Sequence, residues 1–246
     1  MKILLTNDDG YNAEGITALC NVLSQKHETY IIAPDRERSA CSNIFTVRDR
    51  VEVTRINENI FSISGYPADC VSIGLHSDII PEVDMVISGI NHGPNLGDDI
   101  HFSGTVAGAR TAYIFGKPGI AFSIDSFHRP SSYFYEASEF LLDYIDTGLT
   151  EKFFFYNINY PELSRDAVRG IKYTSLSRRY YKDSYKKYNT DDADIFGVSL
   201  VGQIDSELKP GCDSAEMADG FISITPLSID STDYKALEKL KNKTEG

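Results

Sequence analysis

The chain has 246 residues, and 24 basic against 36 acidic side chains give it a formal net charge of -12. This charge opposes the neutralisation of phosphates on which binding of a nucleic-acid polymer depends, so a long DNA or RNA partner is not expected. No stretch approaches the roughly 20 apolar residues of a membrane span, and the N-terminus lacks the features of a signal peptide. We therefore expect a cytoplasmic protein without a membrane partner, in which four widely spaced cysteines stay free thiols.

The first predicted strand, Lys2–Leu5, leads into two adjacent carboxylates and a glycine. Successive side chains of a strand point to opposite faces, so Asp8 and Asp9 can meet at one point only if the backbone turns there, which Gly10 permits. A hard divalent cation between the two carboxylates, at the carboxyl end of a first parallel strand, is one interpretation. An Asp-Gly turn with solvated carboxylates is the alternative.

Up to about residue 125, short β-rich runs alternate with helical stretches, which predicts a mostly parallel sheet covered by helices on both faces. The predicted strands are Lys2–Leu5, Tyr30–Ala33, Met85–Ser88 and Gly119–Ser123, and the predicted helices are Ile16–Leu23, Ala68–Leu75 and Val106–Phe115. Thr46–Ile56, where valines alternate with charged residues, and Phe61–Ile63 predict an inserted β-hairpin.

The loop after the second predicted strand, residues 33–42, contains Ser39, whose hydroxyl can ligate a metal beside two carboxylates or can hold a turn. The run SGINHGPNLGDDIHFSGTVAGA, residues 88–109, follows the third predicted strand. Its glycines fit neither GxGxxG nor a P-loop, so they either let the backbone approach a ligand or make a flexible loop. The amide oxygens of Asn91 and Asn95 suit magnesium, manganese or calcium, although either residue could cap a turn instead.

The same run ends at the start of a predicted helix. Ser103, Gly104 and Thr105 place hydroxyls and backbone N–H groups at a helix N-terminus, where an anion is favoured, although an ordinary N-cap has the same sequence. His92 and His101 could shuttle protons. Asp98 and Asp99 resemble the first acidic pair, but we interpret them as residues that hold their own turn.

The second half of the chain predicts a helix at Tyr133–Ile145 and a strand at Phe153–Ile158, followed by a different kind of segment. RRYYKDSYKKY, residues 178–188, has four tyrosines and a local charge of +4. It predicts an exposed hairpin or arm whose tyrosines cover a sheet edge or a neighbouring subunit, and stacking on bases is the alternative. A strand at Phe221–Thr225 and a charged helix at Ser231–Lys241 complete a single domain. We divide it into a core of about 1–172 and 209–230, an arm of about 173–208 and a C-terminal helix of about 231–241.

Five blocks of sequence, in their order and spacing, resemble the SurE family of stationary-phase survival proteins, which are metal-dependent nucleotidases. These blocks are TNDDG, APDRERSA, PADCV, SGINHGPNLGDDIHFSGTVAGA and PGCDSAEMADGFISITPL. The resemblance covers about residues 1–126 and 209–240, and residues 173–208 diverge most. Tyr66, Phe102 and Cys212 stand where the family has threonine, tyrosine and threonine.

The resemblance implies a Rossmann-like three-layer α/β fold with a mostly parallel sheet, an inserted β-hairpin, an exposed arm, and a C-terminal helix exchanged between the subunits of a homodimer or homotetramer. It implies a hydrolase of the 5'-nucleotidase type that releases phosphate from nucleoside 5'- or 3'-monophosphates, with one divalent cation (Mg, Mn or Ca) per subunit. By position, the metal ligands are Asp8, Asp9, Ser39 and Asn91, and the residues near the phosphate are Asn95, Ser103, Gly104 and Thr105.

The mechanism that we expect is hydrolysis in which the cation polarises the phosphoryl group and lowers the pKa of a water. Asp8 and Asp9 are the catalytic residues, because one of them orients or deprotonates that water. A covalent aspartyl-phosphate on Asp8 is a rival mechanism. A nucleotide-sensing protein without catalysis is a second function class, and the missing GxGxxG disfavours a third, an NAD-linked oxidoreductase.

Overall fold

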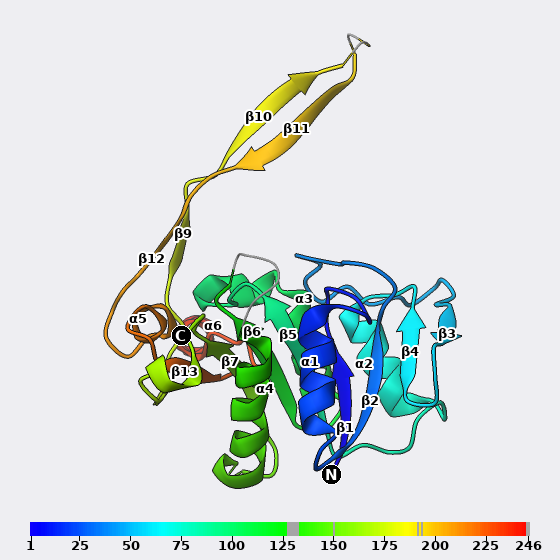
Figure 1. Ribbon diagram of the computed structural model, residues 1–246. Coiled ribbons are helices and arrows are strands. Elements are labelled where there is room, and N and C mark those ends of the chain that lie inside the picture. Colours follow the sequence, from blue (N-terminus) through cyan, green and yellow to red (C-terminus); the bar gives the residue numbers. More distant parts are fainter. Residues whose placement is uncertain (127–132, 150, 191, 193, 245–246) are drawn as a thin grey trace.

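The computed structural model of the chain describes residues 1–126, 133–149, 151–190, 192 and 194–244 (Figure 1). A central sheet has the strand order β3-β4-β2-β1-β5-β6-β7-β13-β8. Its strands are β1 Lys2–Thr6, β2 Glu28–Pro34, β3 Val53–Arg55, β4 Ile60–Ile63, β5 Met85–His92, β6 Gly119–Ile124, β7 Phe155–Tyr160, β8 Ile171–Tyr173 and β13 Ile222–Pro226. The helices are α1 Glu14–Leu23, α2 Pro67–His76, α3 Gly104–Ile114, α4 Phe134–Asp143, α5 Asp213–Ala218 and α6 Tyr234–Thr244, with short turns η1 Gly97–His101, η2 Tyr144–Gly148 and η3 Arg165–Ala167.

The strands from β4 to β7 run parallel, while β3 and β13 pair antiparallel with β4 and β7. The predicted α/β fold with a mostly parallel sheet is therefore confirmed. The chain passes from β1 to β2 on one side and later returns to β5 on the other side of β1. The strand order thus reverses between β1 and β5, and open α/β sheets bind ligands in the crevice at the carboxyl ends of the strands at such a point.

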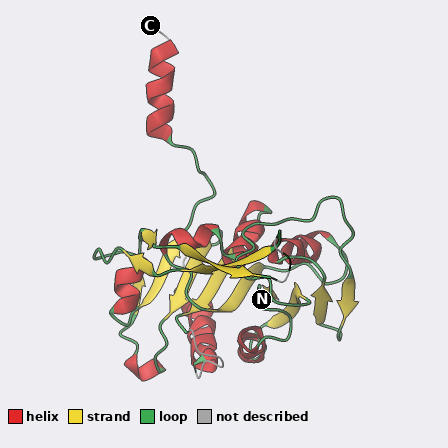
Figure 2. Ribbon diagram, turned by 90° about the horizontal axis from the view of Figure 1, so that it is seen from above, coloured by secondary structure: helices red, strands yellow, loops and turns green. Residues whose placement is uncertain are grey.

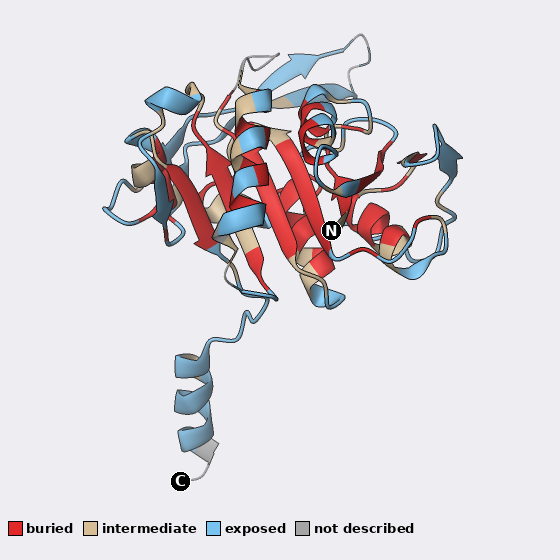
Figure 3. Ribbon diagram, turned by 60° about the horizontal axis from the view of Figure 1, so that its bottom comes forward, coloured by how far each residue is buried: buried red, intermediate tan, exposed pale blue. Residues whose placement is uncertain are grey.

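Helices cover both faces of the sheet (Figure 2). Ile3 and Leu5 of β1 pack in one cluster with Ile16 of α1 and Leu141 of α4. Leu4, which points to the opposite face, packs in a second cluster that includes residues of α2 and α3. The central strands of this core are buried along most of their length (Figure 3). Each fully buried aliphatic side chain of this kind stabilises the fold by about 1.5–3 kcal/mol, which makes the sheet a rigid base for the loops at its edge.

The predicted strand Thr46–Ile56 is wrong for most of its length, because side-chain hydrogen bonds replace strand pairing there. The amide and hydroxyl of Thr46 donate to the carboxylate of Asp69 at 2.7 and 2.8 Å. Asp69 also accepts from the amide of Tyr66 at 2.9 Å and so caps the start of α2. β3 alone forms a strand of this segment, and its antiparallel partner β4 joins β2, so the hairpin extends the main sheet.

The arm consists of two antiparallel ribbons that lead away from the body (Figure 1). The first, which we call the stalk, pairs β9 (Arg179–Tyr181) with β12 (Ile204–Ser206), and the second, which we call the tip, pairs β10 (Ser184–Asn189) with β11 (Phe196–Val201). α6 projects separately from the body (Figure 2), and both extensions are largely exposed (Figure 3). Within the described part of the chain, none of the helices has the length and apolar character needed to cross a bilayer.

Candidate active site

A cavity of about 710 Å³ lies where the loops after β1, β2 and β5 meet the start of α3. Five of the residues predicted from the sequence line it: Asp8, Ser39, Asn91, Asn95 and Ser103. These residues come together because the carboxyl ends of parallel strands lie along the same edge of the sheet. The stalk of the arm closes another side of this cavity with Tyr181 and Ile204.

The turn that presents the two carboxylates is built by Asn7, a buried residue to which the sequence analysis assigned no role. Its side-chain amide donates to the carbonyl of Gly10 at 2.9 Å, and its Oδ1 accepts the amide of Gly10 at 3.1 Å. Gly10 has φ +113°, a conformation that favours glycine. Asp8 then faces the cavity, whereas Asp9 lines an adjoining cavity of about 360 Å³, and His92 lines both.

Asp8 is the most deeply buried carboxylate of the predicted site, with 4% of its surface exposed. The hydroxyl of Thr105 donates to its Oδ1 at 2.5 Å. Burial raises the pKa of Asp8 to about 6, and the charge of Asp9 adds to that increase, while the hydrogen bond from Thr105 opposes it. The charge of Asp9, which raises this pKa, is itself negative, so a cation would relieve the site.

Strand β5 itself has a bulge near its carboxyl end, which places Asn91. The pairing of β5 with β6 shifts register between Ser88 and Asn91. A Cβ at Gly89 would lie 2.2 Å from the carbonyl oxygen of Phe122, so glycine is required for this close approach. The side-chain amide nitrogen of Asn91 donates to the carbonyl of Gly93 at 2.7 Å. Its amide oxygen is therefore the end that remains to ligate a metal.

Asn95 is held by a buried amide network that the sequence analysis missed. Its backbone amide donates to Oδ1 of Asn159 at 2.8 Å, and its carbonyl accepts the side-chain amides of Asn157 and Asn159 at 2.8 and 3.0 Å. Its own side-chain nitrogen donates to the hydroxyl of Ser123 at 2.8 Å. The available signal was the pair of asparagines in the apolar strand β7, because buried amides need partners.

Ser39 lies at the exposed side of the cavity and donates to the carboxylate of Glu37 at 2.8 Å. Its loop is tied to the first turn by the amide of Arg38, which donates to the carbonyl of Asp8 at 2.6 Å. The loops after β1 and β2 are thereby joined beside the cavity.

The start of α3 faces Asp8. Ser103 caps the helix, because its hydroxyl accepts the amide of Val106 at 3.1 Å, and its own amide donates to the carbonyl of Asp99. The amide of Thr105 donates to the carboxylate of Asp8. Among the described residues no hydrogen bond uses the amide of Gly104, which leaves this N–H for an anion.

The second acidic pair, Asp98 and Asp99, binds the stalk, so the interpretation that both residues hold their own turn was wrong. The amide of Arg179 donates to Asp98 at 2.9 Å, and its guanidinium pairs with Asp99 at 2.7 Å. The hydroxyl of Tyr181 also donates to Asp99. His101 is exposed and does not line the cavity, whereas His92 does.

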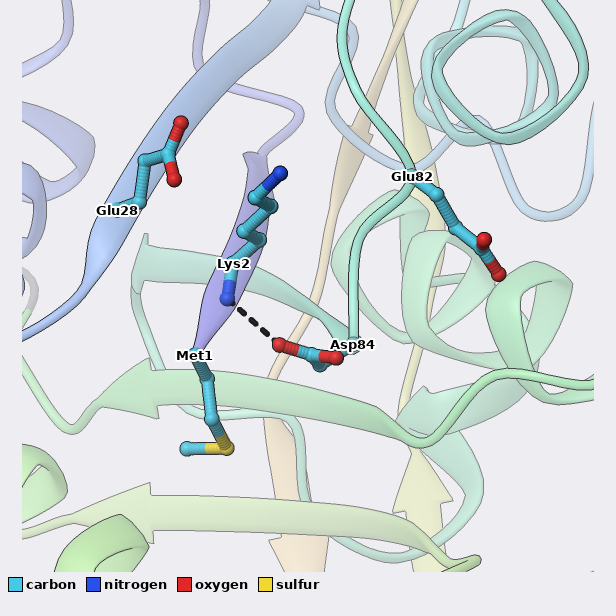
Figure 4. Close-up of a pocket in the computed structure, with 5 residues that line it drawn as sticks. All are labelled: Met1, Lys2, Glu28, Glu82 and Asp84. Atoms are coloured by element: carbon cyan, nitrogen blue, oxygen red, sulfur yellow. Dashed lines mark hydrogen bonds between the residues drawn. The ribbon is translucent and has the colours of Figure 1, made fainter.

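Two further observations concern other cation sites. In the part of the chain that the structure describes, no group of three or more His, Cys, Asp or Glu side chains could hold a metal, and the predicted ligand set has only two such residues. A separate cavity of about 700 Å³ lies at the opposite end of β1, beside Lys2 (Figure 4). Its three carboxylates have partners, because Asp84 accepts the amide of Lys2 at 2.7 Å, Glu82 pairs with Lys117 at 2.9 Å and Glu28 accepts the hydroxyl of Tyr30.

Comparisons with known proteins agree with the fold. A family model described as Survival protein SurE matches residues 3–183. The chain is 41% identical to the 5'-nucleotidase SurE of Leptospira interrogans, over 98% of this chain and 97% of that protein. It is 38% identical to the 5'-nucleotidase SurE of Thermosipho africanus, over 100% and 98% of the two chains. The crystal structure of the SurE protein from Aquifex aeolicus superposes with a TM-score of 0.84 at 34% identity, covering 99% of this chain and all of that one.

Proposed function

The chain belongs to the SurE family, and from this membership we propose that it is a phosphomonoesterase, a hydrolase of the 5'-nucleotidase type. Its substrates are nucleoside monophosphates, which it converts to nucleoside and inorganic phosphate. The observation that carries the proposal is the position of Asp8. This buried carboxylate follows β1, where the strand order reverses, and it is hydrogen-bonded to the start of α3. A helix start that is ready to bind an anion lies there beside a carboxylate that favours a cation.

The donor set of the cavity fits a hard divalent cation such as Mg, Mn or Ca. The proposed ligands are Asp8, Asp9, Ser39 and Asn91. Two observations support this set. Asp8 is buried beside another anion, and the side-chain nitrogen of Asn91 is used in a hydrogen bond, which leaves the side-chain oxygen to ligate the cation. When bound, the cation would polarise the phosphoryl group and lower the pKa of a water.

The residues of the chain itself would bind and orient the phosphate. The amide of Gly104 and the side chains of Asn95 and Ser103 lie at the start of α3. There they would bind the phosphate oxygens that do not react, because a helix start favours negative charge. Thr105 acts through Asp8, because its hydroxyl and amide hold that carboxylate. Asp8 and Asp9 orient the attacking water, and one of them accepts its proton. These contacts on Asp8 favour direct attack by water over an aspartyl-phosphate, and mass spectrometry of protein trapped during turnover distinguishes the two.

Release of inorganic phosphate from AMP and GMP tests the function. Activity should appear with a divalent cation, disappear on chelation, and be lost in Asp9→Asn. Asp84→Asn is the matched control, because it removes an exposed carboxylate at the opposite end of β1 and should keep the activity. Binding of AMP without any release of phosphate would instead identify a nucleotide-sensing protein.

We also propose that the protein forms a homodimer or homotetramer in the cytoplasm and that the C-terminal helix is exchanged between subunits. Support comes from α6, which projects from the body with Tyr234 and Leu240 exposed by 63% and 61%. Apolar side chains on an isolated helix are stabilised when a second chain covers them. The four cysteines carry free thiols, as is usual in a reducing compartment.

A further inference from the structure

Two kinds of residue line the cavity beside Asp8. Some carry the carboxylate, amide and helix start described above. Four others, Phe102, Tyr181, Leu200 and Ile204, bring aromatic or aliphatic side chains. These four side chains are between 39% and 58% exposed, although three of them belong to an arm that is remote from Asp8 along the chain. A cavity of about 710 Å³ is within the size range of about 300–1,000 Å³ that small-molecule sites occupy.

The register of the stalk explains why these side chains face the cavity. Tyr181 pairs directly with Ile204, so both side chains lie on the same face of the ribbon, and Arg179 lies on that face two residues earlier. Tyr180 lies on the other face and is 54% exposed. The ring of Phe102 meets the ring of Tyr181 edge to face, with centroids 6.4 Å apart and planes at 86°.

Tyr181 is fixed in place by contacts of the stalk with Asp99 of η1, which also lines the cavity. The guanidinium of Arg179 pairs with Asp99 at 2.7 Å, and their side chains are only 11% and 19% exposed. The hydroxyl of Tyr181 donates to the same carboxylate, so the polar end of the ring is satisfied and its face remains for a ligand. An aromatic surface that is ordered before binding loses little conformational entropy when a ligand arrives.

We propose that Tyr181, together with Phe102, Leu200 and Ile204, forms the binding surface for the nucleobase of the substrate. This inference rests on the proposed function, which places the phosphate at the polar residues of the same cavity. A planar base has a face that stacks on aromatic rings and apolar side chains, whereas a sugar hydroxyl gains little from such a surface. The arm is therefore part of the substrate site, and it selects nucleotides over phosphate esters that lack a base.

Two neighbouring tyrosines provide the test. Tyr181→Ala should raise KM for AMP about tenfold, since stacking on an aromatic side chain contributes about 1–3 kcal/mol per base. It should leave KM for ribose 5-phosphate within about twofold, because that ester has the same phosphate and sugar but no base. Tyr180→Ala is the matched control and should change neither value. Tyr181→Phe keeps the ring and loses only the hydrogen bond to Asp99, so it should raise KM for AMP much less than Tyr181→Ala does, which covers the case in which the alanine variant folds poorly.

Calorimetric binding of adenosine without a cation separates this inference from the proposed function. Adenosine should bind the wild type and Tyr180→Ala, and binding should be about tenfold weaker in Tyr181→Ala. A wild type that binds adenosine in this way but releases no phosphate from AMP would refute the proposed function and leave the inference standing. The inference is overturned if the wild type does not bind adenosine. It is also overturned if Tyr181→Ala changes KM for AMP and KM for ribose 5-phosphate by the same factor, or if it changes neither KM.

Discussion

Thr105 donates its hydroxyl to Oδ1 of Asp8 at 2.5 Å and thereby connects the start of α3 to the first turn of the chain. Both residues are buried, and hydrogen bonds that involve a charged partner contribute about 1.5–3 kcal/mol. The contact means that the position of Asp8 depends on how closely the helix approaches it.

Gly104 permits this approach, so Gly104→Ala should damage the site. A Cβ at this position would lie 2.6 Å from Sγ of Cys41 and 2.9 Å from Oδ2 of Asp8. We expect the unfolding free energy to fall by about 1–3 kcal/mol, the usual cost of overpacking, and kcat for AMP to fall with it. Urea unfolding and steady-state kinetics measure both effects. Gly197→Ala in the tip, where the closest atom would be 3.9 Å away, is the control, and equal effects of the two substitutions would contradict the argument.

Asp213 should be among the most sensitive positions outside the cavity. This fully buried carboxylate accepts the amides of Gly97 at 2.8 Å, Ser177 at 2.9 Å and Ser214 at 2.8 Å, and so joins the loop before α3 to the beginning of the arm. Asp213→Ala leaves three donors without their acceptor and should destabilise the protein by about 3 kcal/mol or more. Thermal unfolding compares it with Asp219→Ala, an exposed change at the end of the same helix that should have little effect. A stable Asp213→Ala variant would show that these amides find other partners.

The sequence was sufficient for the features that depend on local pattern and on the parallel topology. The apolar run before Asp8 predicts β1, and the rule that parallel strands end at one edge predicts that Asp8, Ser39 and Asn91 share a cavity. The topology alone is enough for that prediction. It does not predict that Asp9 lines an adjoining cavity, because the direction of this side chain depends on the turn that Asn7 stabilises.

The features that the sequence did not predict depend on contacts between remote segments. Alternating valines predicted a strand around Thr46, but Asp69 binds that residue instead. Likewise, the charges of residues 178–188 indicated an exposed arm, whereas Arg179 pairs with Asp99 and brings Tyr181 into the cavity. A pattern within a short window contains no information about a partner about 80 residues away.

Stability should depend on pH through Asp125. Burial raises the pKa of this carboxyl, and the charge of Glu162 adds to the increase. The folded protein therefore holds the proton more tightly than the unfolded chain does, and the stability gained from this proton is lost as the pH rises through the folded pKa. Asp125→Asn removes the charge, so it should stabilise the protein at about pH 8 and have less effect at about pH 4. Urea unfolding across this range tests the sign. Asp166→Asn, at an exposed carboxylate, is the control, and a gain that does not change with pH would contradict the prediction.

The outer part of the tip, residues 186–199, should be needed for assembly rather than for the cavity. The register of β10 and β11 places Tyr185, Phe196 and Val198 on one face of a two-stranded ribbon, where each is more than half exposed. An isolated ribbon of this kind is marginally stable in water, so we expect another subunit to cover its apolar face. A deletion of the whole segment 178–188 would also remove Arg179 and Tyr181 from the substrate site. Replacing residues 186–199 by a short turn spares the stalk and should lower the sedimentation coefficient while calorimetric binding of a divalent cation is kept.

The control for that experiment keeps the apolar face and changes the charge of the tip. Lys186→Ser changes a residue that pairs with Ser199 on the other face and leaves the apolar side chains in place, so this variant should sediment like the wild type. Salt screens charge pairs but strengthens apolar contacts. If apolar burial by the tip drives assembly, the variant without the tip has lost that surface, and it should stay small when the salt concentration is raised. An unchanged sedimentation coefficient after removal of the tip would assign assembly to another surface, and loss of cation binding would show that the tip acts on the cavity.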